Sequence, residues 1–164
     1  MMGISPRTSG QDNAVTVAWP DDFVALYKES YRPLVRLAYL MLGTRAEAEE
    51  AVQDAVLAVH RRWDEVADPG SYLRRAVVNR ATGVLRRRMV AHRHVPDPPP
   101  EEQPVHLVEL RDLLLSLPER QRAAIVLRYV EDVRDRDIAD TLGCREATVR
   151  SLVARGLKTL RAEV

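Results

Sequence analysis

Two stretches of the chain concentrate side chains that could bind phosphate groups or read the edges of bases. The first runs from Tyr72 to His94 and contains no acidic residue. The second runs from Cys144 to Lys158 and mixes basic residues with hydroxyl groups. Such groups donate hydrogen bonds to phosphates and base edges, so both stretches are candidate nucleic-acid contacts. Their basic and hydroxyl-bearing members include Arg74, Arg75, Arg80, Arg86, Arg87, Arg88 and Arg93, and then Arg145, Thr148, Arg150, Ser151, Arg155 and Lys158.

The second stretch belongs to a pattern of two short helices separated by a turn. Ile138 and Leu142 lie one helical turn apart, and Gly143 stands where the first helix must end. Apolar residues continue at helical spacing from Val149 to Leu160, so the two helices can share one buried seam. A DNA-reading helix-turn-helix fits this pattern. Any helical hairpin must also expose polar side chains, so this stretch alone leaves both interpretations open.

The net charge of +1 conceals a separation of charge along the chain. Acidic residues cluster within 47–54 and again within 101–112, outside the basic stretch that ends at His94. Segregated charge suits a protein that touches nucleic acid on one surface and a different partner on another. Solvated helix faces remain an equally simple explanation of the acidic clusters.

Helical patterns on either side of a proline-rich segment organise these stretches into two domains. Thr44 and Glu47 have the spacing of a capping box, Asp21 or Asp22 can cap the preceding helix, and Ser71 can cap the following one. The sequence VAHRHVPDPPPEEQ then predicts an extended tether. We expect an all-α protein of two small helical domains joined by a proline-rich linker, with a helix-turn-helix in the C-terminal domain. The predicted parts are a flexible tail at 1–18, a first domain at 19–90, a linker at 91–104 and a second domain at 105–164.

Several classes of function find no support in the residues. Cys144 is the only cysteine, which excludes an internal disulfide, and we expect it to pack as a small apolar group. His92 and His94 form a weak metal signal in the linker, and no glycine-rich phosphate loop, metal-ligand spacing or nucleophile motif appears. We therefore predict no enzyme activity, catalytic residue, metal or cofactor. Without a signal-peptide core or an apolar run of membrane length, we expect a cytoplasmic protein with no membrane insertion.

With this layout, the chain resembles the small, two-domain extracytoplasmic-function sigma factors of bacterial RNA polymerase. AEAEEAVQDAVLAVHRRW at 46–63 resembles the family's helix for core polymerase, and DPGSYLRRAVVNRATGVLRRR at 68–88 resembles its segment for the minus-ten promoter element. Residues 117–161 resemble the domain for the minus-thirty-five element, and LGC and ARGL are similar to the SigE-like actinobacterial branch. The resemblance implies a subunit that binds core polymerase, recognises promoter DNA and promotes transcription initiation at a specific regulon. An anti-sigma protein is a further partner that many members have.

The resemblance also implies two sites in the first domain. An acidic face with an apolar anchor would dock on polymerase, and a second set would capture an unpaired base and bind phosphates near the minus-ten element. On sequence alone, the amide of Asn79 could equally be buried, and Trp63 and Tyr72 fit core aromatics better than stacking platforms. The core-polymerase-binding set is Glu50, Gln53, Asp54 and Leu57, and the minus-ten set is Asn79, Arg80, Arg86, Arg87 and Arg88.

In the second domain, the N-terminal half of the second helix is expected to enter the major groove. Arg150 and Ser151 are the candidates for base edges, whereas Arg145, Arg155 and Lys158 suit phosphates, and Thr148 completes the minus-thirty-five set. A solvated charge at the helix end is the plain alternative for Lys158.

Three departures from the family pattern make the promoter sequence less predictable than the function. Gly83 replaces a frequent aspartate and predicts a bent or less firmly held helix, Leu152 replaces a frequent basic residue, and Arg145-Glu146-Ala147 replaces a small-residue turn. A stand-alone repressor or activator is the alternative interpretation. Such a regulator would normally need a dimer interface or a ligand-sensing domain, and the tether and the basic helix of the first domain argue against it.

Overall fold

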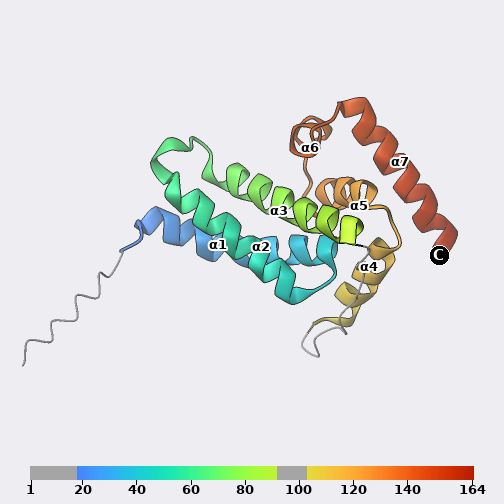
Figure 1. The fold of residues 1–164 in the computed structure, drawn as a ribbon, viewed down its shortest axis with the longest axis horizontal. Helices are drawn as coiled ribbons and strands as arrows, with labels where there is room; N and C mark the ends of the chain where they lie inside the picture. The colour runs from blue at the N-terminus through green and yellow to red at the C-terminus, as the bar shows by residue number, and fades with distance from the viewer. Residues whose placement is uncertain (1–17, 92–102) are drawn as a thin grey trace, which may run out of the picture.

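The computed structural model describes residues 18–91 and 103–164, and these residues form helices and connecting turns without a β-strand. The first domain contains α1 (Asp21–Leu42), α2 (Arg45–Arg61), the short 3₁₀ helix η1 (Trp63–Glu65) and α3 (Pro69–Ala91). The second contains α4 (Val105–Leu115), α5 (Glu119–Ile125), the π-helical turn η2 (Val126–Val130), α6 (Asp135–Leu142) and α7 (Glu146–Glu163). Figure 1 shows α7 on the far side of the second domain from α1–α3. The predicted all-α fold is confirmed.

Local signals in the sequence set most helix ends of the first domain. α1 stops at Gly43, which has a φ of 88° that glycine adopts without strain. The cap at Thr44 is confirmed, because the Glu47 amide donates to the Thr44 hydroxyl at 3.4 Å. The Glu47 carboxylate reaches back to Thr44 as predicted, but it accepts from the Thr44 hydroxyl, at 2.7 Å. Because these signals act within four residues, they could be read directly from the sequence.

Two predicted caps are wrong. Pro20 occupies the position before α1 with no side-chain cap, and Asp21 and Asp22 lie inside the first turn, where their charges still favour the helix dipole. α3 begins earlier than Ser71, because Pro69 is favourable in a first helical turn. Asp68 takes the capping role instead, since its carboxylate accepts bonds from the Ser71 amide at 3.2 Å and hydroxyl at 2.7 Å. These bonds stabilise the charged form and lower the pKa of Asp68.

The second domain contains the predicted helix-turn-helix. α6 ends at Gly143, whose φ is 61°, and the amide of Cys144 closes the turn on the Ala139 carbonyl at 3.0 Å. Cys144 is half-buried against the core, as expected for a small apolar group. α7 also packs closely on α5: a Cβ on buried Gly156 would collide with Ile125. The glycine therefore allows the two helices to approach each other.

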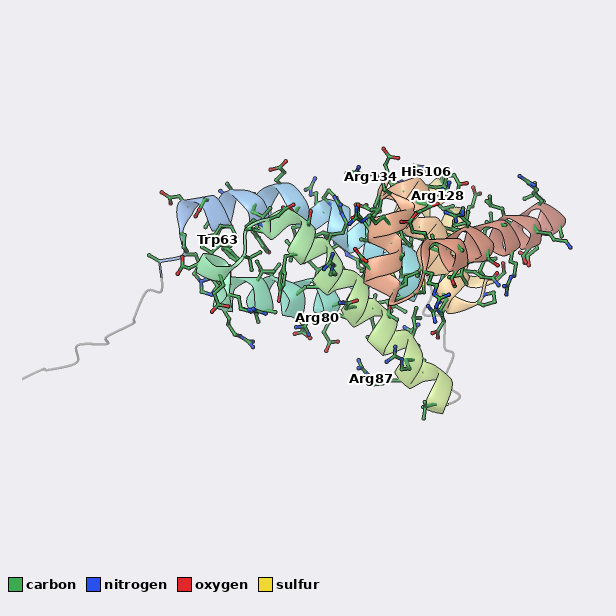
Figure 2. The ribbon with its side chains drawn as sticks, turned by 90° about the horizontal axis from the view of Figure 1, so that it is seen from above. Trp63, Arg80, Arg87, His106, Arg128 and Arg134 are labelled. Carbon is green, nitrogen blue, oxygen red and sulfur yellow. The ribbon has the colours of Figure 1, made fainter. Side chains whose placement is uncertain are left out.

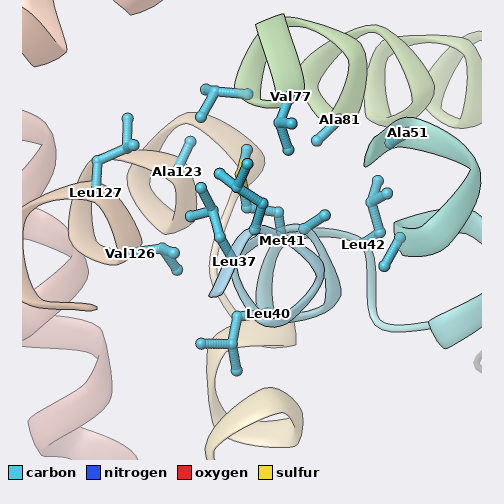
Figure 3. Close-up of a cluster of buried hydrophobic side chains, with 14 of the residues drawn as sticks. Leu37, Leu40, Met41, Leu42, Ala51, Val77, Ala81, Ala123, Val126 and Leu127 are labelled. Carbon is cyan, nitrogen blue, oxygen red and sulfur yellow. The ribbon is translucent and has the colours of Figure 1, made fainter. Parts of the chain in front are cut away.

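The apolar core runs through both domains without a break (Figure 3). In the close-up, Leu37 and Met41 of α1 lie between Val77 of the first domain and Leu127 of the second, and Leu40 points to the opposite side of α1. Leu37 and Leu40 are completely buried, and each such leucine contributes about 2 kcal/mol to folding. The two helical domains are thus packed against each other. No helix within the described ranges is long and apolar enough to cross a membrane.

Candidate polymerase and nucleic-acid interface

A groove of about 680 Å³ runs between α2 and α3 and brings two predicted site sets together. One wall comes from α2 and carries carboxylates, and the other comes from α3 and carries arginines. Of the predicted residues, the groove is lined by Glu50, Asp54, Asn79, Arg80, Arg87 and Arg88. Arg80 and Arg87 project from the same side of α3 (Figure 2). The sequence assigned these residues to two partners, and the fold places them on facing walls.

The α2 side of this region is an exposed acidic face with an apolar member. Glu50, Gln53 and Asp54 are exposed, and Leu57 has 44% of its surface accessible although it is apolar. Only Glu50 and Asp54 of the four point into the groove. Gln53 turns toward α1, where its side chain bonds to Tyr31, whose pKa is raised chiefly by burial. An exposed leucine within a rim of charge has the composition of a docking surface.

The α3 wall presents one amide and a row of arginines. The Asn79 side chain is exposed, which excludes the buried amide that the sequence left open. Arg86 and Arg87 are also exposed, although Arg86 lies outside the groove. The amide donates and accepts hydrogen bonds, and exposed guanidinium groups bind phosphate. This wall can therefore present donors to both a base and a backbone.

Two ion pairs cross the groove. The Arg80 guanidinium lies 3.7 Å from the Asp54 carboxylate, and Arg88 pairs with Glu47. Arg88 also donates to the Leu42 carbonyl at 2.7 Å, so it satisfies the C-terminal end of α1. Of the three neighbouring arginines at 86–88, Arg88 thus has a structural role that sequence reasoning missed.

The aromatic residues beside the groove are held by other parts of the first domain. Trp63 packs edge-on against Phe23 with ring centres 5.2 Å apart, which agrees with the prediction of a core aromatic. Tyr72 lines the groove, and its hydroxyl accepts a bond from Arg62 at 3.4 Å. Gly83 also lines the groove, and α3 continues through it as one helix, so the predicted weakness does not break the helix.

The minus-thirty-five set gathers along α7 and the turn before it. Arg145 precedes the first turn of α7, and Thr148, Arg150, Arg155 and Lys158 are exposed. Arg155 donates to the Ser151 hydroxyl at 2.8 Å, and Arg150 lies 3.8 Å from Glu146. Both contacts are local and solvent-accessible, so they can exchange for DNA contacts at little cost. Leu152 instead packs partly buried against the core, which explains an apolar residue at this position.

Sequence reasoning missed the polar groups between the two domains. Arg111 of α4 has 3% of its surface accessible, and its guanidinium donates to the Tyr39 hydroxyl at 3.0 Å and the Gly43 carbonyl at 3.1 Å. Arg74 of α3 lies 3.6 Å from Glu131, which follows η2. A single cation within the apolar helix VHLVELRDLLL was the one signal that could have indicated a buried arginine.

Burial also shifts the pKa of charged groups close to the contact between the two domains. Burial lowers the pKa of the Arg122 guanidinium to about 10. The negative charge of Glu119 opposes this shift, and the positive charge of Arg88 adds to it. Burial raises the pKa of Glu119 and of Glu131, and Arg74 opposes the shift at Glu131.

No metal-binding cluster of three or more His, Cys, Asp or Glu occurs among residues 18–91 and 103–164, and His92 and His94 lie outside these ranges.

The fold and these sites define an all-helical, two-domain protein that carries a helix-turn-helix. Residues 26–90 match the family described as Sigma-70 region 2, and residues 107–160 match Sigma-70, region 4. The chain is 32% identical to the RNA polymerase sigma-E factor of Streptomyces avermitilis over 80% of this chain and 78% of that one. It is 36% identical to the ECF RNA polymerase sigma factor SigM of Mycobacterium tuberculosis, over 81% and 72%.

Solved structures agree in fold. The sigma factor RpoE of Bartonella quintana, solved in complex with the anti-sigma factor NepR, has a TM-score of 0.73 at 21% identity, over 87% of this chain and 96% of that one. SigJ of Mycobacterium tuberculosis has a TM-score of 0.63 at 28% identity, over 84% and 52%. The chain belongs to the extracytoplasmic-function sigma factors. It is therefore an RNA polymerase sigma factor, which binds core polymerase, recognises promoter DNA and directs transcription initiation.

Proposed function

We propose that this sigma factor binds its partners through two surfaces. The groove of the first domain and its α2 side contact polymerase and the minus-ten element, and the exposed face of α7 contacts the minus-thirty-five element. Glu50, Asp54 and Leu57 contact core polymerase, with Gln53 beside them. Asn79 takes an unpaired base of the minus-ten element. Phosphates next to that base are bound by Arg80, Arg86 and Arg87, and by Arg88 after its internal contacts yield.

The observation that carries this proposal is the pairing of an acidic wall and a basic wall in one groove. A carboxylate face with an exposed leucine suits a basic protein surface, because opposite charges attract and the apolar group anchors the contact. The amide and the guanidinium groups suit a displaced DNA strand, which offers base edges and phosphates. Polymerase bound at α2 would thus hold the DNA-binding wall of α3 next to the melted promoter.

On α7, Arg150 and Ser151 contact base edges of the minus-thirty-five element, with Thr148 beside them. Phosphates are bound by Arg145, Arg155 and Lys158. Support comes from the exposure of Thr148, Arg150, Arg155 and Lys158 along α7, because a helix-turn-helix presents the N-terminal part of its second helix to the major groove.

The remaining features of the proposal concern organisation. The parts are a tail at 1–18, domains at 19–90 and 105–164, and a linker at 91–104. The protein acts in the cytoplasm, as a binding subunit with no catalysis of its own, and an anti-sigma protein regulates it. The relation to a sigma factor solved with its anti-sigma factor supports the last point.

Run-off transcription tests this function. Purified core polymerase is combined with the full chain and genomic DNA fragments, and transcripts are mapped. We expect new transcripts with defined start sites that depend on the added chain. Core polymerase that responds to a different sigma factor but gives no such transcript with this chain would overturn the proposal.

A further inference from the structure

A further cavity lies away from the groove between α2 and α3. It has a volume of about 660 Å³, and its lining comes from α1, the first two turns of α2 and the start of α4. We call it the α1–α4 pocket. It shares no lining residue with the groove. In Figure 2, His106 of this pocket lies along the upper edge of the molecule, whereas Arg80 and Arg87 of the groove lie lower in the view.

The α1–α4 pocket is positively charged. Its lining includes three arginines, Arg32, Arg36 and Arg45, but among its described lining residues only one acid, Glu49. The Glu49 carboxylate is already paired with Arg45 at 2.9 Å. Arg32 and Arg36 are exposed, and within the described part of the chain neither side chain forms an ion pair or a hydrogen bond. The pocket therefore has two cations that an anion from solution can bind.

The two unpaired arginines repel each other. Arg32 and Arg36 are one turn apart on α1, about 6 Å along the helix axis, and like charges at this spacing destabilise a helix. Glu131 does not relieve the repulsion, because its carboxylate forms its ion pair with Arg74 at 3.6 Å. Burial raises the pKa of Glu131, and Arg74 and then Arg36 oppose that shift. A bound anion between the two guanidinium groups would remove the repulsion.

The start of α4 adds backbone donors to the same pocket. Pro104 precedes α4 without a side-chain cap, and the first turn of this helix contains no acidic residue. Both Pro104 and His106 line the pocket. The first amides of a helix have no partner within it and form the positive end of its dipole, so they favour an anion. Arginines and helix amides thus meet at one cavity.

The remaining lining of the α1–α4 pocket includes apolar surface. Tyr39 and Leu107 are buried, and Val35 is half-buried. The volume lies within the range of about 300–1,000 Å³ that is typical of small-molecule sites. Guanidinium groups bind phosphate through paired hydrogen bonds, and two of them one turn apart can bind more than one phosphate. The lining therefore suits a ligand with several phosphates and a partly apolar body.

We propose that the α1–α4 pocket binds a small polyphosphorylated molecule, of which nucleoside triphosphates are the simplest members. Arg32, Arg36 and the start of α4 bind the phosphates, and Arg45 adds its charge from the start of α2. Val35 and Leu107 contact the nucleoside. None of these residues belongs to the surfaces proposed for polymerase or promoter DNA, so the inference does not depend on those surfaces.

Titration calorimetry of the full chain with ATP, GTP and pyrophosphate, without divalent cations, tests the pocket. We expect one triphosphate site, with tighter binding than pyrophosphate because the nucleoside buries apolar surface. Arg32→Gln and Arg36→Gln should each lower the triphosphate affinity by about tenfold, since each removes a charged hydrogen-bond donor. Both side chains are exposed, so the helical circular dichroism should not change. Binding of all three probes that is weaker than about millimolar would overturn the proposal.

Two variants control for charge and for location. Lys28 is exposed and lies one turn before Arg32 on α1, outside the pocket lining, and Arg87 lines the groove of the first domain. Lys28→Gln and Arg87→Gln should both keep the triphosphate affinity. An equal loss in Lys28→Gln would mean that only the net charge matters, and a loss confined to Arg87→Gln would place the triphosphate in the groove. Either result would overturn the pocket, whereas failure of the proposed function would appear only as absent transcripts.

The pyrophosphate titration tests the apolar part of the pocket. Pyrophosphate that binds as tightly as ATP and GTP would overturn the contact of the nucleoside with Val35 and Leu107. A triphosphate should also raise the thermal midpoint of the unaltered chain, because ligand that binds only the folded state stabilises it. This rise should be smaller in the double variant Arg32→Gln with Arg36→Gln, and an equal rise in that variant would contradict binding by these arginines.

Discussion

Asp54 on α2 and Arg80 on α3 face each other across one groove, with their charged groups 3.7 Å apart. Both side chains are well exposed, so the pair adds little to stability and can exchange its partners easily. The same contact connects a residue proposed to bind polymerase with one proposed to bind DNA. Polymerase that covers Asp54 would leave Arg80 available to a phosphate.

Reversal of the charge at Asp54 should separate polymerase binding from folding. Asp54→Arg should weaken binding to core polymerase by about tenfold or more, because a cation replaces a carboxylate at a contact between opposite charges. Binding of labelled chain to purified core measures the effect. The double variant Asp54→Arg with Arg80→Asp restores the ion pair but not the acidic face, so it should bind as weakly. Full recovery of polymerase binding in the double variant would show that the ion pair across the groove, and not the acidic face, controls this binding.

Truncation of Asn79 should impair promoter opening and leave polymerase binding intact. Asn79→Ala removes one base contact and should lower the amount of open complex by about fivefold to tenfold, since a hydrogen bond contributes about 1 kcal/mol. Permanganate reactivity of unpaired thymines measures opening. On a promoter with an artificially unpaired minus-ten region, part of the defect should remain, because the base is still not held. A variant that opens promoters normally would remove Asn79 from the site.

Arg150 and Lys158 should affect DNA binding in different ways. Arg150→Ala should cost about 1–3 kcal/mol on the preferred minus-thirty-five sequence and relax the preference at one base position. Lys158→Ala should weaken binding to all sequences equally and reduce the salt dependence by about one unit. Binding of holoenzyme to a panel of single-base variants at several salt concentrations distinguishes the two. Equal loss on every sequence for Arg150→Ala would contradict its role at a base.

Replacement by alanine should destabilise the protein more at Gly43 than at Gly143, because Gly43 lies at the contact between the two domains. Gly43→Ala and Gly143→Ala both place a side chain at positive φ, which costs about 1 kcal/mol. A Cβ at Gly143 meets nothing within 4 Å, whereas one at Gly43 crowds Leu115 across the junction. Urea unfolding should therefore show a larger loss of stability for Gly43→Ala. An equal loss for both would mean that Leu115 adjusts without cost.

The pH dependence of stability should reveal the partly buried carboxylate of Glu131. Its pKa is raised above the ordinary 4.5, chiefly by burial, so the folded state holds this proton more tightly than the unfolded state does. The stability linked to this group is present below pH 4.5 and is lost as the pH rises through the raised pKa. Glu131→Gln should lack this loss and gain stability relative to the unaltered chain as the pH rises above 4.5. Urea unfolding at several pH values measures the difference, and a constant difference would contradict it.

The helices and their exposed faces followed from the sequence, because the signals that set them are local. The cap at Thr44, the stop at Gly43 and the turn at Gly143 each act within a few residues. Exposure of Arg150 and Asp54 followed from helical periodicity in the same way. The expected caps at Asp21 or Asp22 and at Ser71 failed because neighbouring prolines compete locally, so the helices begin elsewhere. The π-helical turn at Val126–Val130 was not predicted.

Sequence by itself determined the family, the order of the helices and which groups face solvent. Only the tertiary structure decided which groups meet, because contacts such as Arg88 with Leu42 or Arg111 with Gly43 join residues far apart in the chain. No local pattern reveals whether a cation will find an acceptor at the end of a distant helix. In the tertiary structure, Arg88 stabilises the end of α1 and Asn79 is exposed. Arg111 lies at the contact between the two domains.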